Sequence, residues 1–103
     1  MRGRPVKYNT PRYREWETVA KLVIMATGKP PQPIDTPVIL LCNFFMQTRR
    51  KVDLSNLYEG IQDVLVATGV LADDNHTIVV GHDGSRVHYD RENPRTEVSI
   101  IRT

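Results

Sequence analysis

The sequence predicts an α+β fold, in which two helices pack on a small mixed β-sheet. The chain has 103 residues, the length of one domain, and we expect that domain to cover residues 1–103. Apolar residues recur at helical spacing in two segments, and strand-like apolar or alternating patterns occupy three others. There is no apolar run long enough to span a membrane and no apolar leader after Met1. A lone cysteine, Cys42, excludes an internal disulfide and fits a reducing cytoplasm.

The first helix is expected at residues 11–27, after a basic arm at residues 1–9. Thr10 offers a hydroxyl N-cap, and Pro11 suits the first helical position because the N–H that proline lacks has no helical partner there. Gly28 can take the left-handed conformation that ends a helix. The expected apolar face comprises Trp16, Val19, Ala20, Val23 and Thr27. Trp16 is interpreted as a core residue.

Residues 37–46 predict a strand that is apolar on both faces. Val38, Leu40, Cys42, Phe44 and Met46 share one face, and Ile39, Leu41 and Phe45 share the other. Such a strand should be covered on both sides. A short chain has few elements to cover both faces of a sheet, so we predict that a second copy supplies the cover in a homodimer.

The second helix is expected at residues 54–68 and to end at Gly69. Its buried stripe is expected to contain Leu54, Leu57, Ile61, Val64, Leu65 and Thr68. An acidic loop follows at residues 70–76. Residues 77–80 and 86–89 favour short strands that pair with each other across Asp83-Gly84 or form one longer strand, and alternation around residues 97–100 indicates a last strand with one wet face.

The net charge of +2 conceals an uneven distribution. Residues 1–51 carry ten Lys or Arg and three acids, whereas residues 52–103 carry four Arg and nine acids. This asymmetry suggests a surface for a polyanion beside an acidic centre, although charge alone favours the alternative of two solvated faces. The residues expected to bind the phosphates of a polyanion are Arg2, Arg4, Lys7, Arg12, Arg14, Arg49, Arg50 and Lys51.

Three aspartates flank the second helix: Asp53 just before it, and Asp73 and Asp74 just after it. Carboxylates gathered in one pocket repel each other and require a cation, and oxygen ligands favour Mg²⁺ or Mn²⁺. Such an ion supports phosphodiester hydrolysis. The helix separates its two ends, so the aspartates meet only if the chain doubles back or if two copies combine. The alternative is that Asp53 is an N-cap and residues 73–75 form an ordinary Asx turn.

The segment Arg49-Arg50-Lys51-Val52-Asp53-Leu54-Ser55-Asn56-Leu57, followed by Asp63-Val64-Leu65, Gly69-Val70-Leu71 and Asp73-Asp74, resembles the RusA family of Holliday-junction resolvases. Gly3-Arg4, Tyr13, Trp16-Glu17 and Pro94-Arg95-Thr96-Glu97 extend the resemblance over almost the whole chain. The resemblance implies an intertwined homodimer of bacterial or phage origin, located in the cytoplasm. It also implies Mg²⁺-dependent cleavage of branched DNA and no small-molecule cofactor.

Carried over residue by residue, the resemblance implies a metal site of Asp53, Asp73 and Asp74. Ser55 replaces the second aspartate of the family's Asp-x-Asp, and Glu59 replaces a lysine. Ser55 and Glu59 are four residues apart on one helical face, so Glu59 is a candidate for the missing carboxylate and for a catalytic role. The family's opening strand has no counterpart before Gly3-Arg4. The alternative function is a catalytically decayed dimer that still binds DNA.

Overall fold

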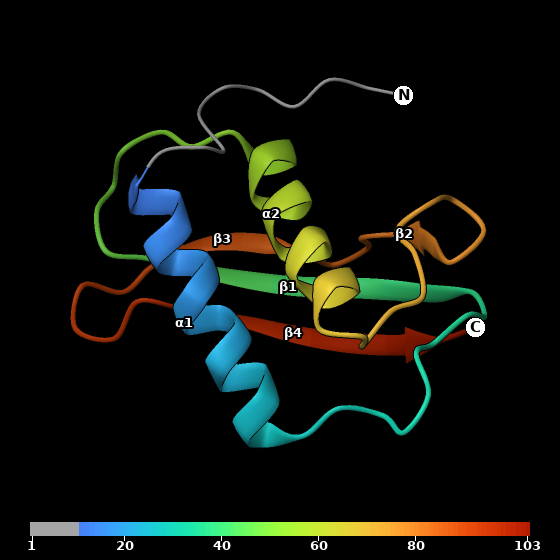
Figure 1. Ribbon diagram of the computed structural model, residues 1–103. Coiled ribbons are helices and arrows are strands. Elements are labelled where there is room, and N and C mark those ends of the chain that lie inside the picture. Colours follow the sequence, from blue (N-terminus) through green and yellow to red (C-terminus); the bar gives the residue numbers. More distant parts are fainter. Residues whose placement is uncertain (1–10) are drawn as a thin grey trace.

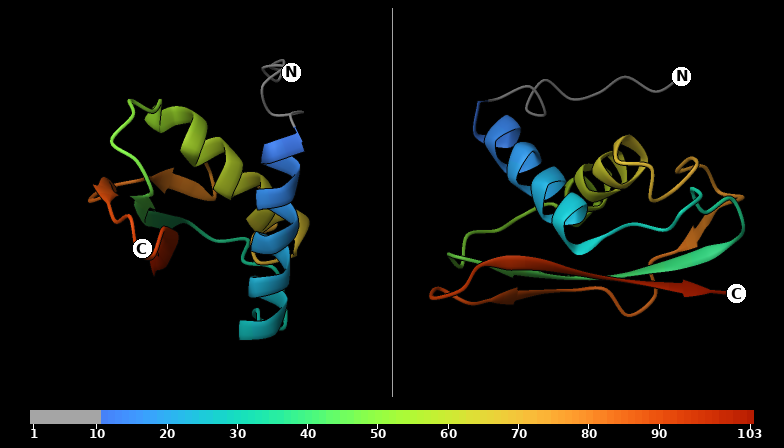
Figure 2. Two further views of the ribbon diagram at one scale, coloured as in Figure 1. Left: turned by 90° about the vertical axis from the view of Figure 1, so that its left-hand side faces the viewer. Right: turned by 60° about the horizontal axis from the view of Figure 1, so that its bottom comes forward.

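The computed structural model describes residues 11–103, and side chains from residue 15 onward. Two helices, α1 (Pro11–Thr27) and α2 (Leu54–Ala67), lie on one face of a four-stranded sheet (Figures 1 and 2). The strands are β1 (Val38–Met46), β2 (Val79–Gly81), β3 (Arg86–Tyr89) and β4 (Arg95–Arg102). This arrangement confirms the predicted α+β class with a mixed sheet. Neither helix is long and apolar enough to cross a membrane.

Strand β1 is the centre of the sheet. It pairs antiparallel with β4 from Val38 to Phe45, and parallel with both β2 and β3. A strand has two edges, and β4 fills one of them, so β2 and β3 follow each other along the other edge. The expectation that residues 77–80 and 86–89 pair with each other or form one strand is wrong, because each segment instead pairs with β1.

Ser85 closes the gap in the sheet between β2 and β3. Its side chain is buried, and its Oγ accepts a hydrogen bond from the Cys42 amide at 2.8 Å and donates to the Leu40 carbonyl at 3.3 Å. A buried backbone group without a partner is costly, so this hydroxyl replaces the ladder bonds that a continuous strand would make. The sheet therefore tolerates the turn at residues 82–85 beside its most buried strand.

The core lies between β1 and α2. Val38, Leu40 and Cys42 of β1 are fully buried, and burial raises the pKa of the Cys42 thiol to about 11. The buried or half-buried stripe of α2 is the predicted one, from Leu54 to Thr68. Thr68 caps the helix, and Gly69 follows with a φ of 82°, which confirms the predicted end of the helix to within one residue.

Helix α1 has the predicted bounds but a different buried face. Trp16, Val19 and Val23 are 36%, 59% and 53% exposed, whereas Ile24 packs against the core. The interpretation of Trp16 as a core residue is wrong. Apolar residues occur on both sides of this helix, so their spacing did not distinguish the face that packs from the face that does not. As a result, α1 carries an exposed apolar stripe.

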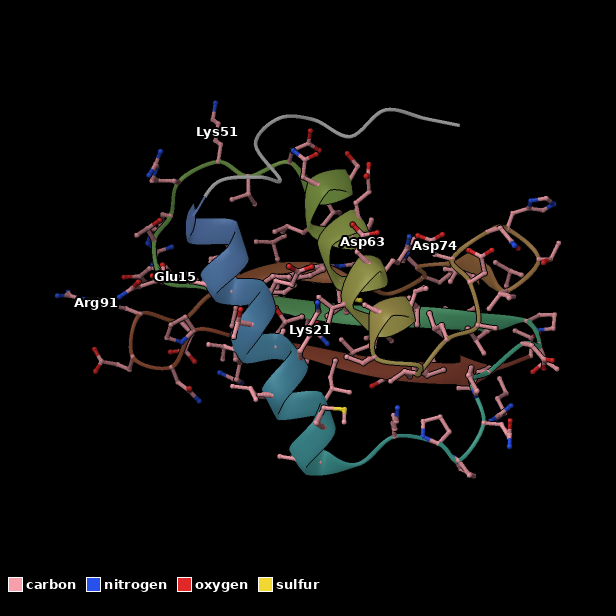
Figure 3. The ribbon with its side chains drawn as sticks, in the orientation of Figure 1. Glu15, Lys21, Lys51, Asp63, Asp74 and Arg91 are labelled. Atoms are coloured by element: carbon pink, nitrogen blue, oxygen red, sulfur yellow. The ribbon has the colours of Figure 1, made fainter. Side chains whose placement is uncertain are left out.

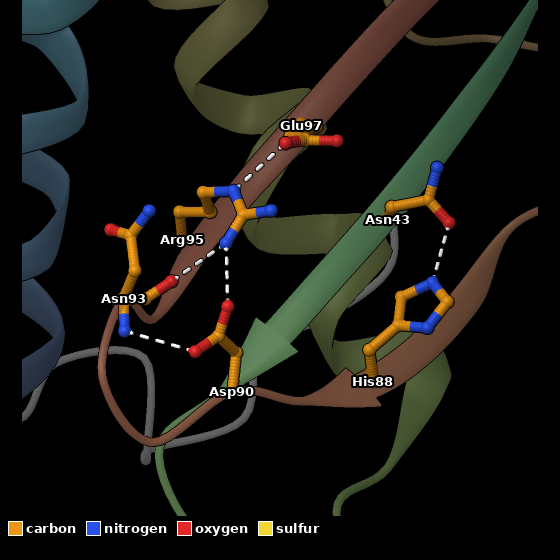
Figure 4. Close-up of polar contacts among 6 residues, drawn as sticks. All are labelled: Asn43, His88, Asp90, Asn93, Arg95 and Glu97. Atoms are coloured by element: carbon orange, nitrogen blue, oxygen red, sulfur yellow. Dashed lines mark hydrogen bonds and ion pairs between the residues drawn. The ribbon is translucent and has the colours of Figure 1, made fainter.

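The sheet face away from the helices is covered by no element of residues 11–103. Ile39, Leu41 and Phe45 are half-buried there. The Arg95 guanidinium lies 3.8 Å from the centre of the Phe45 ring, and the His88 ring stacks on it at 4.6 Å. Figure 4 shows how Arg95 is held by Asp90 and Glu97, and His88 by Asn43. The chain's own polar side chains thus shield part of the face for which we predicted a partner subunit.

Candidate functional site

Asp53 is the N-cap of α2. Its Oδ1 accepts hydrogen bonds from the Ser55 amide at 3.1 Å and the Ser55 hydroxyl at 2.7 Å. The capping role weighed from the sequence is therefore present. Capping and ligand binding are compatible, because a carboxylate has two oxygens and several lone pairs. The side chain is exposed at the junction between the basic turn, which comprises Arg49, Arg50 and Lys51, and the helix.

Glu59 lies one turn into α2, four residues after Ser55. Its Oε1 is buried and has no hydrogen-bond partner in the described part of the chain. A buried carboxylate oxygen without a donor carries a desolvation penalty, which a cation or a proton donor relieves. Glu59 therefore has the property expected of a carboxylate that acquires its partner on binding.

Asp73 and Asp74 lie in the loop after α2, which buried Leu71 anchors through a bridge to Ile34. Asp73 Oδ1 accepts from the Asp74 amide at 2.7 Å, and Asp73 Oδ2 accepts from Asn75 Nδ2 at 3.2 Å. The Asx turn predicted for this segment is at Asn75, whose Oδ1 accepts from the Thr77 amide at 3.0 Å, whereas Asp73 accepts from the amide of the next residue. Asp74 is half-buried, and Figure 3 shows it in the loop between α2 and β2.

The carboxylates are distributed along α2. A helix of 14 residues, as α2 is, measures about 21 Å, so Asp53 and the start of the acidic loop are at its opposite ends. Within residues 11–103, no three His, Cys, Asp or Glu side chains form a group that would hold a metal ion. Carboxylate oxygens are the type of ligand that Mg²⁺ prefers, and the buried Glu59 Oε1, which has no hydrogen-bond partner in the described residues, would be stabilised by a cation. The complete ligand set is not assembled in the described part of one chain, and the assignment of Asp53, Asp73, Asp74 and Glu59 stays a prediction.

The basic turn lies between β1 and α2. All three of its side chains are exposed, and Figure 3 shows Lys51 pointing away from the fold. The Arg49 guanidinium lies 4.1 Å from the centre of the Tyr89 ring, which fixes it over β3. Arg2, Arg4 and Lys7 lie outside the described residues. Arg12 and Arg14 belong to α1, but the description of side chains begins after them.

A cavity of about 700 Å³ opens between α1, the start of α2 and the end of β1, and its lining also includes Phe45 and Arg95 from the other face of the sheet. Its lining comprises Trp16, Phe44, Phe45, Met46, Gln47, Val52, Asp53, Asn56, Leu57, Gly60, Pro94, Arg95 and Thr96. Asp53 thus belongs to the wall of a cavity as well as to the cap. No local pattern in the sequence indicates this cavity, because its walls come from four segments whose convergence depends on the β1–β4 register.

His82 is a second feature that the sequence did not indicate. Its ring stacks on Tyr58 at 4.0 Å between centroids, and its Nε2 lies 2.6 Å from Gln62 Oε1. Burial lowers the pKa of His82, and the charge of Asp83 partly opposes that shift. Through these contacts, His82 connects α2 to the segment between β2 and β3, so the imidazole has a structural role.

Comparison with known proteins complements this geometry. The model of the family described as Endodeoxyribonuclease RusA matches residues 2–101, nearly the whole chain. No curated protein matches this chain. The match includes the basic turn, the Asp53 cap, helix α2 and the acidic loop, the segments that carried the resemblance in the sequence. The chain belongs to the RusA endodeoxyribonuclease family.

Proposed function

We propose that this protein is a structure-selective endodeoxyribonuclease that resolves Holliday junctions and related branched DNA with Mg²⁺ or Mn²⁺. The observation that carries the proposal is that the basic turn leads directly into the Asp53 carboxylate. Arg49, Arg50 and Lys51 are exposed directly before Asp53. A phosphodiester held by these cations would be presented to the first carboxylate of the acidic face.

Asp53, Asp73 and Asp74 are the proposed metal ligands, and Glu59 is the proposed auxiliary carboxylate. A bound divalent ion supplies activation of water and stabilisation of charge on the phosphoryl group. Arg50 and Lys51 neutralise the phosphates on either side of the cleaved bond. Arg49 is less free to follow the DNA, because it is already positioned over Tyr89.

We further propose that the protein acts as a homodimer, since resolution of a four-way junction requires cuts in two strands. The exposed apolar stripe of α1 supports this proposal. Val19, Leu22 and Val23 lie on one helical face and are more than half exposed. In a dimer, the acidic loop of one copy can meet Asp53 of the other, which is the second of the two arrangements that complete the metal site. Sedimentation as a stable monomer at micromolar concentration would contradict this proposal.

The test is cleavage of a synthetic four-way junction, with a linear duplex of the same sequence as the control for branch selectivity. Each substrate is incubated with Mg²⁺ and, separately, with EDTA. Asp53→Asn removes one proposed ligand, and Asp35→Asn is the matched control, because Asp35 is an exposed acid of the linker between α1 and β1. We expect junction cleavage by the wild type and by Asp35→Asn in Mg²⁺ only. Cleavage that survives Asp53→Asn overturns the site assignment.

The second candidate function is a DNA-binding module without hydrolysis. Two observations favour it: Ser55 stands where the family resemblance implies an aspartate, and no three-carboxylate group is assembled in residues 11–103. The same assay separates the two functions. Retarded migration of the junction without any product in Mg²⁺ or Mn²⁺ would support the binding module and overturn the nuclease.

A further inference from the structure

The cavity between α1, α2 and the sheet has the size and chemistry of a small-molecule site. Ligand-binding cavities occupy about 300–1,000 Å³. Its walls are largely apolar: Trp16 from α1, Phe44 and Met46 from the end of β1, and Leu57 from α2. Phe44 is buried and its ring lies 5.9 Å from that of Tyr58, so this wall is held rigidly. An apolar cavity with a rigid aromatic wall suits a flat, neutral ring.

A few polar groups interrupt the apolar lining. Asn56 and Gln47 each carry an amide that both donates and accepts hydrogen bonds, and Thr96 carries a hydroxyl that does the same. Asn56 and Thr96 are half-buried members of the lining. Mixed donors and acceptors beside a flat apolar surface match the hydrogen-bonding edge of a nucleobase.

The charges around the cavity distinguish a base from a phosphate. The basic turn connects Gln47 and Val52 through Thr48, and both of these residues line the cavity, so its cations border the opening. Asp53 and Arg95 belong to the wall itself, and the Arg95 guanidinium is already paired with Asp90 and Glu97. A phosphate that entered the cavity would approach the Asp53 carboxylate, whereas a phosphate at the opening meets Arg50 and Lys51. The arrangement favours a neutral ring inside and an anionic backbone outside.

We propose that this cavity binds a single nucleobase extruded from the branched DNA, stacked on Trp16, while the basic turn holds the phosphate of the same nucleotide. This inference rests on the proposed DNA substrate and adds a subsite to it. Branch points offer bases that are less completely stacked than those of a duplex, so extrusion costs less there. The captured base would position the adjacent phosphodiester beside Asp53 and would favour branched over linear DNA.

The fluorescence of Trp16, the sole tryptophan of the chain, reports on the proposed contact directly. The protein is titrated in EDTA, so that no DNA is cut, with a single-stranded oligonucleotide and with an abasic oligonucleotide of the same length. Both probes carry the same phosphates, and only the first carries bases. We expect quenching of Trp16 and tighter binding with the first probe only. Equal quenching and equal affinity for the two probes would overturn the proposal.

Variants test the cavity independently of fluorescence. Thr96→Met places a larger side chain in the lining, and Ser99→Met makes a similar change on the same strand at an exposed position of the opposite face. We expect Thr96→Met, but not Ser99→Met, to reduce the affinity for the ordinary oligonucleotide to that for the abasic one. Trp16→Ala should weaken binding about 5- to 150-fold, the equivalent of about 1–3 kcal/mol for base stacking, and Trp16→Phe should restore most of it.

The outcomes separate this inference from the proposed function. Junction binding, measured by the anisotropy of a labelled DNA strand, tests whether the protein is a DNA-binding protein at all. If the junction binds and the two oligonucleotides behave alike, the base subsite is refuted, whereas the proposed binding of branched DNA stands and the cleavage assay alone decides the nuclease. If neither the junction nor any oligonucleotide binds, the proposed function is refuted, and the subsite is refuted with it.

Discussion

Replacement of Asp53 separates the structural and chemical roles of one side chain. Asp53→Ala removes the Oδ1 acceptor of the Ser55 amide and hydroxyl, so the first turn of α2 loses its cap. The loss of such a cap costs about 1 kcal/mol, within a range of about 0.5–2. Asp53→Asn keeps an oxygen that accepts from the same amide, and it loses only the charge at the positive end of the helix, worth about 0.3–1 kcal/mol.

Thermal unfolding followed by circular dichroism measures both variants. For a domain of about 100 residues, 1 kcal/mol corresponds to a shift of about 4–8 °C in Tm. We expect Asp53→Ala to lower Tm by about that amount and Asp53→Asn to lower it by less. Both variants should lose junction cleavage to the same extent. The assignment of Asp53 as a metal ligand would be refuted if Asp53→Asn cleaved the junction at the wild-type rate. It would also be refuted if the cleavage rates of the two variants fell in proportion to their losses in Tm.

Three other perturbations follow from the contacts of the fold. Ser85→Ala leaves a buried backbone amide without its partner and should lower the free energy of unfolding by about 1–3 kcal/mol in urea titrations; Ser99→Ala, at an exposed position, is the control, and equal effects would contradict the bridging role. Arg50→Ala and Lys51→Ala should each reduce the slope of log affinity against log salt by about 0.9 for duplex arms, and unchanged slopes would exclude both from the phosphate contacts. Because the pKa of His82 is lowered in the folded state, its contribution to stability is present above about pH 6.5 and is lost as the pH falls below that value. His82→Gln should flatten this dependence in urea titrations at several pH values, and an unchanged dependence would assign it to another group.

Local signals in the sequence were sufficient for the elements of this fold. The proline after Thr10, the glycines at positions 28 and 69 and the apolar stripe of α2 act within a few residues, and each prediction based on them matches the structure. The division of the β1 side chains between two faces was equally predictable, because side chains alternate along a strand.

Long-range arrangement was less predictable. The buried face of α1 depends on where α2 and the sheet lie, because apolar residues occur on both sides of this helix. The parallel pairing of β3 with β1 depends on the side chain of Ser85, which no turn pattern reveals. The cavity beside Asp53 depends on both, since Trp16 comes from α1 and Thr96 from β4.

The candidate site combines the two situations. Asp53 and its capping role follow from local sequence, and the resemblance to the family supplied its proposed chemistry. Whether Asp53 and the acidic loop share one ion depends on the packing of the loop and on a second copy of the chain, and neither is a local property. Glu59 was selected by its spacing from Ser55 alone, and the structure adds an independent physical reason in its orphaned Oε1.

The central claim is that carboxylates from the two ends of α2 bind one divalent ion. Titration of Mn²⁺ into the protein–junction complex, followed by electron paramagnetic resonance, tests it most directly. The account predicts that Asp53→Asn and Asp74→Asn each abolish the same high-affinity binding event, and that the double variant loses nothing more. High-affinity Mn²⁺ binding that persists unchanged in Asp74→Asn, or that is lost additively in the double variant, would contradict a shared site.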